Sequence, residues 1–378
     1  MTTVVRPLVA LLLAREATAF GLGLRVGTER RFGVRRASPT MSVTSTTRRV
    51  RVEQGVELKC LEYGKPSTDK VVLLLHGFPD CSLSWVRQAP ILASSGFFVV
   101  CPDMRGYGGS SKPPGVASYS REKLCGDVDA LRRHYCGDDG AFLLLAGHDW
   151  GAAVVWACLE GAAAESKCLT KRAAILNVPH PVTFARGLFT PQQLPKSWYI
   201  VAFQIPMVAE SLLSAGDGAV VRRVLGAELK EGGASKSRES LLESYGRAAA
   251  TPGAMQSAVN YYRASGAGLW GGFLPSSFPS PFVDALRLLH GVEGRTRTST
   301  ASSSSTLDRA GSSAVIDVPV LVLWGKNDPY LGIELATPPP DLVPRLTGPV
   351  IFSDAGHWVH WEKAEDINRE LLGFLGGA

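Results

Sequence analysis

The sequence predicts an α/β fold, in which a mostly parallel sheet is flanked by helices and a helical cap is inserted into the chain. Continuous apolar runs of four or five residues are typical of strands that are buried on both faces of a sheet. Segments of helical length separate most of these runs, as in a parallel sheet with crossover helices. The alternation stops after about residue 180 and resumes at Val315. The runs are Val71–Leu75, Phe97–Cys101, Phe142–Leu145, Ala173–Leu176 and Val320–Trp324.

Two segments that precede the first apolar run have a different pattern. Arg49–Val52 and Val56–Tyr63 alternate between apolar and polar side chains, with Gln54-Gly55 between them. Such alternation is typical of antiparallel strands with one solvated face. We therefore expect a hairpin at the sheet edge, as the first part of a core that spans residues 48–180 and 315–378.

Residues 181–314 are predicted to form the helical cap. They contain helical segments such as Met207–Ala215 and Ser257–Ala264, but no apolar run comparable to those of the core. Near the end of the cap, Thr298–Thr306 consists only of Ser, Thr and Ala. This composition buries too little apolar surface to offset the entropy lost on ordering, so we expect a flexible Ser/Thr-rich loop near residues 291–314.

The positive charge of the chain is concentrated at its N-terminus. The net charge is +6 overall, whereas residues 1–50 contain nine arginines, two glutamates and neither lysine nor aspartate, a net charge of +7. The rest of the chain is therefore nearly neutral and gives no indication of a nucleic-acid-binding surface. Because residues 1–47 are rich in arginine and serine and poor in acids, we expect a disordered targeting leader outside the fold.

The leader contains features of an organelle address. Its apolar run, Leu8–Ala14, is too short to cross a bilayer, so no stable membrane span is predicted. The following Ala17-Thr18-Ala19-Phe20 junction resembles the bipartite leaders of algae with complex plastids, in which a transit peptide follows a signal peptide. The resemblance implies a plastid as the destination, with a mitochondrion or the cytoplasm as alternatives.

The seven cysteines give no sign of a disulfide framework. Their number is odd, no C-x-x-C pair occurs, and several lie inside apolar runs. This pattern predicts buried, reduced thiols in a reducing compartment, without a zinc site.

A predicted strand, a turn and a helix follow one another around Asp149. The apolar run that ends at Ala146 leads into Gly147-His148-Asp149-Trp150-Gly151, and the helix-forming segment Ala152–Ala163 comes next. This pattern is typical of a nucleophile elbow, in which the flanking glycines permit a strained turn that lifts the central side chain above the sheet. The alternative is an ordinary strand-to-helix turn in which Asp149 only caps the helix.

Three further segments favour the catalytic interpretation. His76-Gly77-Phe78-Pro79 directly follows an apolar run, and the backbone N–H groups of Phe78 and Trp150 are expected to converge on one oxygen as an oxyanion hole. Asp328 and His357 each follow a later predicted strand. Nucleophile, acid and histidine thus appear in the chain order of the α/β-hydrolases, each past the carboxyl end of a strand.

Together these residues resemble the epoxide hydrolase family of the α/β-hydrolase fold. The resemblance extends from about residue 50 to the C-terminus and includes Gly106-Tyr107-Gly108-Gly109-Ser110. It implies that two tyrosines of the cap, Tyr199 and Tyr262, take part in catalysis, and Tyr262 is preferred to Tyr261 because it precedes Arg263. The implied site consists of the catalytic residues Asp149, His357, Asp328, Tyr199 and Tyr262, the oxyanion-hole residues Phe78 and Trp150, and the supporting residues His76, Gly77, Pro79 and His148.

An aspartate nucleophile suits the opening of an epoxide. Attack by serine would leave an ether, whereas attack by Asp149 forms an ester whose carbonyl carbon belongs to the enzyme. Water activated by His357 then cleaves the ester and releases a vicinal diol, while Asp328 orients the imidazole. Tyr199 and Tyr262 are expected to protonate the epoxide oxygen. The predicted partners are a small apolar epoxide and water, and no metal, organic cofactor, nucleic acid or membrane is predicted.

Several alternatives stay open at this point. Asn177 stands where some relatives place the acid, although an amide carries no charge, and Asp354 is a second competitor of Asp328. A haloalkane dehalogenase with the same nucleophile and a catalytically silent binding protein would share the fold. Five large cap residues would either line an apolar pocket or form the core of the cap. They are Trp198, Phe203, Leu269, Trp270 and Phe273.

Overall fold

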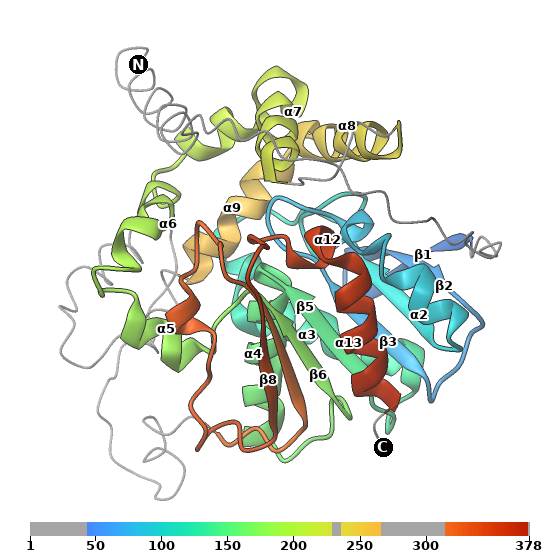
Figure 1. Ribbon diagram of the computed structural model, residues 1–378. Coiled ribbons are helices and arrows are strands. Elements are labelled where there is room, and N and C mark those ends of the chain that lie inside the picture. The colour runs from blue at the N-terminus through green and yellow to red at the C-terminus, as the bar shows by residue number, and fades with distance from the viewer. Residues whose placement is uncertain (1–43, 229–235, 266–313, 377–378) are drawn as a thin grey trace, which may run out of the picture. The chain divides into compact units, whose positions relative to one another are not determined.

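Eight strands form one mixed sheet in the order β1-β2-β4-β3-β5-β6-β7-β8 (Figure 1). This computed structural model describes residues 44–228, 236–265 and 314–376. β2 pairs antiparallel with both β1 and β4, and every other neighbouring pair is parallel. The predicted α/β fold with an antiparallel hairpin at its edge is confirmed. The strands are β1 (Ser45–Glu53), β2 (Val56–Tyr63), β3 (Val71–Leu75), β4 (Phe98–Pro102), β5 (Leu144–His148), β6 (Ala173–Leu176), β7 (Val320–Gly325) and β8 (Leu346–Phe352).

The largest differences from the predicted strand boundaries are in β1 and β5. β1 begins at Ser45, inside the range 1–47 that the sequence assigns to the leader, because it pairs with β2 as far as Ser45 opposite Tyr63. The rest of the predicted leader lies outside the described residues. β5 begins later than predicted, and Phe142 forms only an isolated bridge with Thr170. β5 also ends later than predicted, at His148, directly before Asp149.

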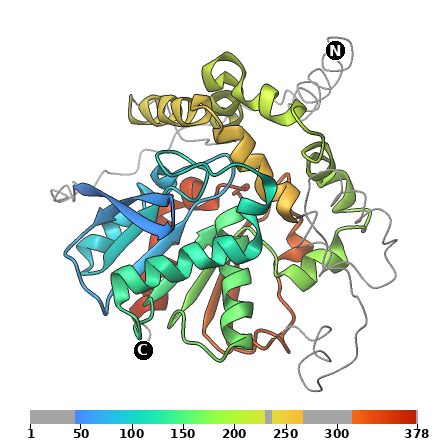
Figure 2. The same ribbon diagram turned by 180° about the vertical axis from the view of Figure 1, so that it is seen from behind.

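Helices cover both faces of the sheet. Figure 1 shows α2 and α13 in front of it, and Figure 2 shows α3 and α4 on the opposite face. Val71, Leu73 and Leu75 of β3 pack in the core cluster that includes α3 and α4, whereas Val72 and Leu74 pack with α2 and α13. Because successive strand residues point to opposite faces, such a strand requires an entirely apolar run. These helices are α2 (Ala89–Ser94), α3 (Arg121–Cys136), α4 (Trp150–Ala164), α12 (Val359–Glu362) and α13 (Ala364–Gly376).

The cap is inserted between β6 and β7, and its described part is helical. The predicted helix Met207–Ala215 corresponds to the first part of α7, and the predicted helix Ser257–Ala264 lies within α9, which begins three residues earlier. α7 is interrupted at residues 215–218, where the backbone dihedral angles are not helical. The predicted Ser/Thr-rich loop near residues 291–314 lies outside the described residues except for its last position. The cap helices are α5 (Pro181–Gly187), α6 (Trp198–Ala202), α7 (Val208–Glu228), α8 (Lys236–Ala250) and α9 (Ala254–Ala264).

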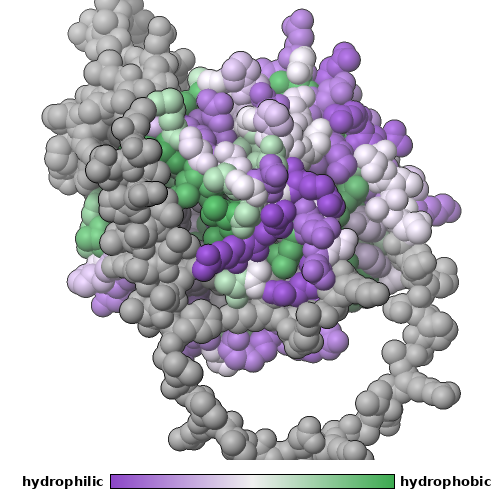
Figure 3. All heavy atoms as spheres, turned by 90° about the horizontal axis from the view of Figure 1, so that it is seen from above, coloured by the Kyte–Doolittle hydropathy of each residue, from purple (hydrophilic) through white to green (hydrophobic). Residues whose placement is uncertain are grey.

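The described surface of the cap is rich in apolar side chains. Five of the eight large hydrophobic side chains that are exposed in the described part of the chain belong to residues 189–207. Seen from above, hydrophobic surface gathers in one region, and hydrophilic side chains dominate much of the remainder (Figure 3).

No helix within residues 44–228, 236–265 and 314–376 has both the length and the apolar character needed to cross a bilayer.

The cysteines are all present as free thiols, but they are not all buried. Cys168 is exposed and Cys125 is half-buried, so the prediction of buried thiols is wrong for these two. Cys125 lies in α3 and Cys168 in the loop between α4 and β6, so neither lies inside the apolar strand runs that suggested burial.

Candidate active site

Asp149 occupies a sharp turn between a strand and a helix. β5 ends at His148, α4 begins at Trp150, and Asp149 between them has φ 49° and ψ −125°. A strained backbone conformation of this kind costs about 1–3 kcal/mol, so the surrounding structure must impose it. The Asp149 side chain makes no capping hydrogen bond to α4, which argues against an ordinary capping aspartate. The turn has the geometry that the sequence predicts for a nucleophile elbow.

Close backbone contacts require the glycines around this turn. A Cβ at Gly147 would lie 2.4 Å from the carbonyl carbon of Gly151, and a Cβ at Gly151 would lie 2.3 Å from the carbonyl oxygen of Leu75. A Cβ at Gly77 in the neighbouring loop would lie 2.5 Å from Asp149 Oδ1. Any side chain at these positions would push the elbow and the loop apart.

The carboxylate of Asp149 lies between a backbone amide and an imidazole. Asp149 Oδ1 accepts a hydrogen bond of 2.6 Å from the Phe78 N–H, and Asp149 Oδ2 lies 3.4 Å from His357 Nε2. Trp150 is the first residue of α4, so its N–H is one of the helix N-terminal amides that have no acceptor within the helix. Both predicted oxyanion-hole residues therefore lie beside Asp149, and the Phe78 amide contacts its carboxylate directly.

A second carboxylate holds His357 from the other side. His357 Nδ1 donates a hydrogen bond of 2.6 Å to Asp328 Oδ2, and both side chains are buried. Asp328 Oδ1 accepts hydrogen bonds from the backbone N–H groups of Tyr330 and Leu331, at 2.7 and 2.9 Å. Asp149, His357 and Asp328 thus form a continuous carboxylate–imidazole–carboxylate chain.

Asn177 and Asp354, the two competitors of Asp328, have other contacts. Asn177 Nδ2 donates a hydrogen bond of 2.8 Å to Asp328 Oδ2, and Asn177 Oδ1 accepts one of 3.0 Å from the Gly325 N–H. Asn177 therefore holds the acid instead of replacing it. Asp354 is largely exposed and forms an ion pair with Lys363. The sequence did not indicate this role of Asn177, whose only signal was its place at the carboxyl end of β6.

The two carboxylates control the charge of His357. Burial lowers the pKa of His357, but Asp328 and Asp149 raise it more strongly, to about 10. Burial raises the pKa of Asp149, and the facing His357 outweighs this effect, so the pKa of Asp149 lies below its ordinary value. At neutral pH the site therefore holds an imidazolium between two carboxylates.

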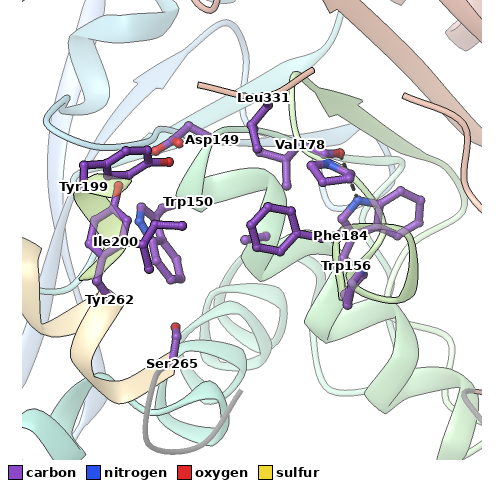
Figure 4. A pocket seen from close by; sticks show the side chains of 13 residues that line it. Asp149, Trp150, Trp156, Val178, Phe184, Tyr199, Ile200, Tyr262, Ser265 and Leu331 are labelled. Atoms are coloured by element: carbon purple, nitrogen blue, oxygen red, sulfur yellow. Dashed lines mark hydrogen bonds between the residues drawn. The ribbon is translucent and has the colours of Figure 1, made fainter. Parts of the chain in front are cut away.

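Two tyrosines of the cap lie beside the nucleophile. The rings of Tyr199 in α6 and Tyr262 in α9 are 6.0 Å apart between centroids, and both line one cavity with Asp149. Figure 4 shows their hydroxyl groups at the end of the cavity that Asp149 occupies. Burial, followed by the charge of Asp149, raises the pKa of both phenols well above the ordinary value, so both keep their protons at neutral pH. Tyr261 instead donates a hydrogen bond of 2.7 Å to the carbonyl oxygen of Arg105.

The cavity in front of Asp149 has a volume of about 130 Å³ and a mostly apolar wall. It extends from Asp149 and the two tyrosines to Phe184 and Trp156 (Figure 4). Within the described part of the chain, its ionisable lining groups are Asp149 and the two phenols. The cavity is therefore suited to binding a neutral, apolar ligand. Its other apolar lining residues are Trp150, Ala153, Val178, Pro179, Pro181, Ile200 and Leu331.

Two of the five cap residues predicted as pocket candidates are described by the structure, and neither of them lines this cavity. Trp198 is not among the lining residues, and Phe203 packs against Phe78 and Tyr262, with ring centroids 5.4 and 4.9 Å away. Leu269, Trp270 and Phe273 lie outside the described residues. The structure adds Tyr330, which the sequence did not single out. Its ring lies 5.2 Å from that of His357 and 5.8 Å from that of Tyr199.

Hydrogen bonds fix the loop that carries Phe78. His76 Nε2 accepts a hydrogen bond of 2.9 Å from the Met104 N–H, so Nδ1 carries the proton and donates to the carbonyl oxygen of Gly77 at 2.9 Å. The peptide bond between Phe78 and Pro79 is cis. His76, Gly77 and Pro79 thus shape the loop without lining the cavity.

His148 belongs to a buried polar group behind the elbow. His148 Nε2 donates a hydrogen bond of 2.8 Å to the carbonyl oxygen of His357, and burial lowers the pKa of His148 to about 3. Ligand atoms of Asp80, His148 and His360 lie within 4.8 Å of one another, close enough to hold a metal ion. However, Ser84 Oγ already bridges Asp80 and His360, at 2.6 and 2.7 Å. These contacts favour a supporting role.

Known proteins resemble this chain in both sequence and structure. Residues 70–364 match the family described as the alpha/beta hydrolase fold. Epoxide hydrolase A of Mycobacterium tuberculosis is 29% identical over 353 residues, which cover 88% of this chain and 98% of that protein. AB hydrolase superfamily protein YfhM of Bacillus subtilis is 31% identical over 308 residues, which cover 81% and 90%.

A solved structure resembles the described fold. It belongs to a study of "novel epoxide hydrolases belonging to the alpha/beta hydrolases superfamily in metagenomes from hot environments". It matches with a TM-score of 0.64 and 28% sequence identity, and the match covers 89% of this chain and 100% of that chain.

Proposed function

The chain belongs to the α/β-hydrolase family, and within this family we propose that it is an epoxide hydrolase that converts an apolar epoxide to a vicinal diol. One observation carries the proposal: a carboxylate and two protonated phenols surround one end of an apolar cavity. Opening an epoxide requires a nucleophile at carbon and an acid at oxygen in the same place. The relatives that are named epoxide hydrolases support the same activity.

Asp149 and the two tyrosines perform the first step. A carboxylate oxygen of Asp149 attacks a ring carbon, and the bond between that carbon and the epoxide oxygen breaks. Tyr199 and Tyr262 donate hydrogen bonds to the oxygen, and one of them gives its proton to the alkoxide as it forms. The product is a hydroxyalkyl ester of Asp149.

Ester formation changes the charge around His357. In the resting site Asp328 and Asp149 together raise the pKa of His357 to about 10, despite its burial. Once Asp149 is a neutral ester, its share of this effect is lost, and the pKa of His357 falls toward the range in which an imidazole acts as a base. The proton that His357 loses restores the tyrosine that gave up its own proton, so the same histidine is a cation during ring opening and a base during ester hydrolysis.

His357 and the oxyanion hole complete the second step. His357 deprotonates a water molecule, which attacks the ester carbonyl. The N–H groups of Phe78 and Trp150 stabilise the resulting oxyanion, and the loss of one such donor typically costs about 3–4 kcal/mol. Collapse of this intermediate releases the diol and restores Asp149.

The direct test is turnover by the purified full chain. Terminal, aryl and fatty-acid epoxides are supplied, and the diol is detected. Asp149→Ala is expected to abolish diol formation, and an unchanged rate in that variant would refute the nucleophile assignment. Failure of the unaltered protein to convert any epoxide would favour a binding protein, and halide release from haloalkanes would favour a dehalogenase.

A matched pair of tyrosine variants tests the proton donors. Tyr262→Phe is expected to slow alkylation of Asp149, because it removes a hydroxyl that faces the cavity. Tyr261→Phe is the control, since its hydroxyl bonds the Arg105 carbonyl oxygen. Pre-steady-state measurement of ester formation separates them. Equal rates in the two variants would contradict the role of Tyr262.

A further inference from the structure

Gln193 joins the cap to the loop that follows β7. Its side chain is fully buried, and its amide contacts both the residue that precedes α6, the helix of Tyr199, and residues 328–332, which begin with Asp328. Given the proposed epoxide hydrolase activity, on which this inference rests, we propose that Gln193 is a positioning residue. It sets the proton donor of the cap, Tyr199, and the acid of the core, Asp328, in place relative to each other.

On the side of the core, the Gln193 amide binds two backbone groups. Gln193 Nε2 donates a hydrogen bond of 2.8 Å to the carbonyl oxygen of Tyr330, and Gln193 Oε1 accepts one of 2.9 Å from the Gly332 N–H. Because a backbone carbonyl only accepts and a backbone N–H only donates, these two bonds fix the orientation of the amide. They enclose Leu331 in the sequence, whose side chain lines the cavity and whose N–H bonds Asp328 Oδ1.

On the side of the cap, the same amide binds Ser197. Gln193 Nε2 donates its second hydrogen bond, of 2.9 Å, to Ser197 Oγ, which in turn donates to the carbonyl oxygen of Gln193 at 3.3 Å. Ser197 is buried and directly precedes α6, but its side chain makes no capping hydrogen bond to that helix. The hydroxyl of Ser197 therefore ties the start of α6 to Gln193.

Lys196 adds a second link between the cap and this loop. Its Nζ donates a hydrogen bond of 2.8 Å to the carbonyl oxygen of Asp328. Together with the bond to the Gly332 N–H, the cap thus holds backbone groups at both ends of residues 328–332. Loss of these contacts is expected to shift the acid relative to Tyr199, and a misplacement of about 1 Å can lower a rate by about 10²-fold.

A matched pair of glutamine variants tests the proposal. Gln193→Met removes all three side-chain hydrogen bonds at similar size, and Gln192→Met is the control, because the neighbouring Gln192 is exposed. In Gln193→Met we expect both alkylation of Asp149 and hydrolysis of the ester to slow by about 10–10²-fold, with the control unchanged. Pre-steady-state measurement reports both rate constants. A loss of folded protein alone would instead lower the amplitude of ester formation.

Ser197→Ala separates the two sides of the contact with a milder change. It keeps the bonds from Gln193 to Tyr330 and Gly332 and removes only the link to α6. We expect slower alkylation of Asp149 and an unchanged rate of ester hydrolysis. Unchanged rate constants for both steps in Gln193→Met, or in Ser197→Ala should Gln193→Met not fold, would overturn the proposal.

Hydrogen exchange tests the contact without any substrate. An amide that loses its acceptor exchanges through smaller local openings, so the Gly332 N–H is expected to exchange faster in Gln193→Met than in Gln192→Met. Equal exchange in the two variants would also overturn the proposal. Failure of the unaltered protein to convert any epoxide would refute the proposed function, and the exchange rates would then decide by themselves whether Gln193 holds the loop.

Discussion

In the proposed reaction, the protonation state of His357 separates the two chemical steps. Replacement by glutamine removes the base but leaves Asp149, Tyr199 and Tyr262 in place. In His357→Gln we expect the hydroxyalkyl ester to accumulate and turnover to fall by about 10²–10⁴-fold, the usual contribution of a general base. Intact-protein mass spectrometry in a single turnover detects the ester as added mass. A variant that turns over slowly without any adduct would contradict the two-step route.

Asn177 positions the acid through its amide. In Asn177→Ala the buried Asp328 Oδ2 loses the donor at 2.8 Å, which is expected to lower the free energy of unfolding by about 1–3 kcal/mol and to slow diol formation. Asp354→Asn is the control, because Asp354 is exposed and paired with Lys363. Urea unfolding and diol assays of both variants measure the difference. If the two variants had the same stability and the same rate of diol formation, the proposed role of Asn177 in positioning Asp328 would be contradicted.

At the scale of elements, the junction of β5 and α4 depends on glycines with different surroundings. A Cβ at Gly151 meets the Leu75 carbonyl oxygen at 2.3 Å, whereas a Cβ at Gly161 in the same helix meets nothing within 4 Å. Gly151→Ala is therefore expected to destabilise the fold by about 1–3 kcal/mol through overpacking. Gly161→Ala is expected to stabilise it by up to about 1 kcal/mol through helix propensity. Thermal unfolding distinguishes the two variants. If both substitutions changed the melting temperature in the same direction, the contact expected at Gly151 would be refuted.

The sequence predicted correctly those elements whose structure depends on residues that are close together in the chain. The apolar runs of β3 and β7 and the Gly147–Gly151 turn depend on neighbours in the chain. The start of β1 at Ser45 depends instead on pairing with β2, which lies elsewhere in the chain. Asn177 and Tyr330 escaped prediction for the same reason, since their roles arise only from contacts with Asp328 and His357.

At the scale of the whole molecule, the buried chain of charges links stability to pH. The folded pKa of His357, about 10, lies above the ordinary value of 6.5. A raised pKa contributes stability that is complete below about 6.5 and is lost as the pH rises toward 10. We expect the melting temperature to fall over this window for this reason.

Asp149→Asn tests the origin of this pH dependence. The variant removes one of the two carboxylates that raise the pKa of His357, while Asp328 remains. Its loss of stability is therefore expected to occur at lower pH than in the unaltered protein. Calorimetry at a series of pH values measures the shift. Superimposable profiles of the two proteins would contradict the assignment of the charged pair.

Because the cap is inserted between β6 and β7, the residues of the site are synthesised at widely separated times. Asn177 and Asp328 touch each other but are separated by 151 positions along the chain. During synthesis the elbow and its helix emerge long before the acid, and closing so long a loop is entropically slow. In a nascent chain the carboxylate of Asp149 is therefore not yet paired with His357, and the proposed reaction requires that β7 and β8 have joined the sheet.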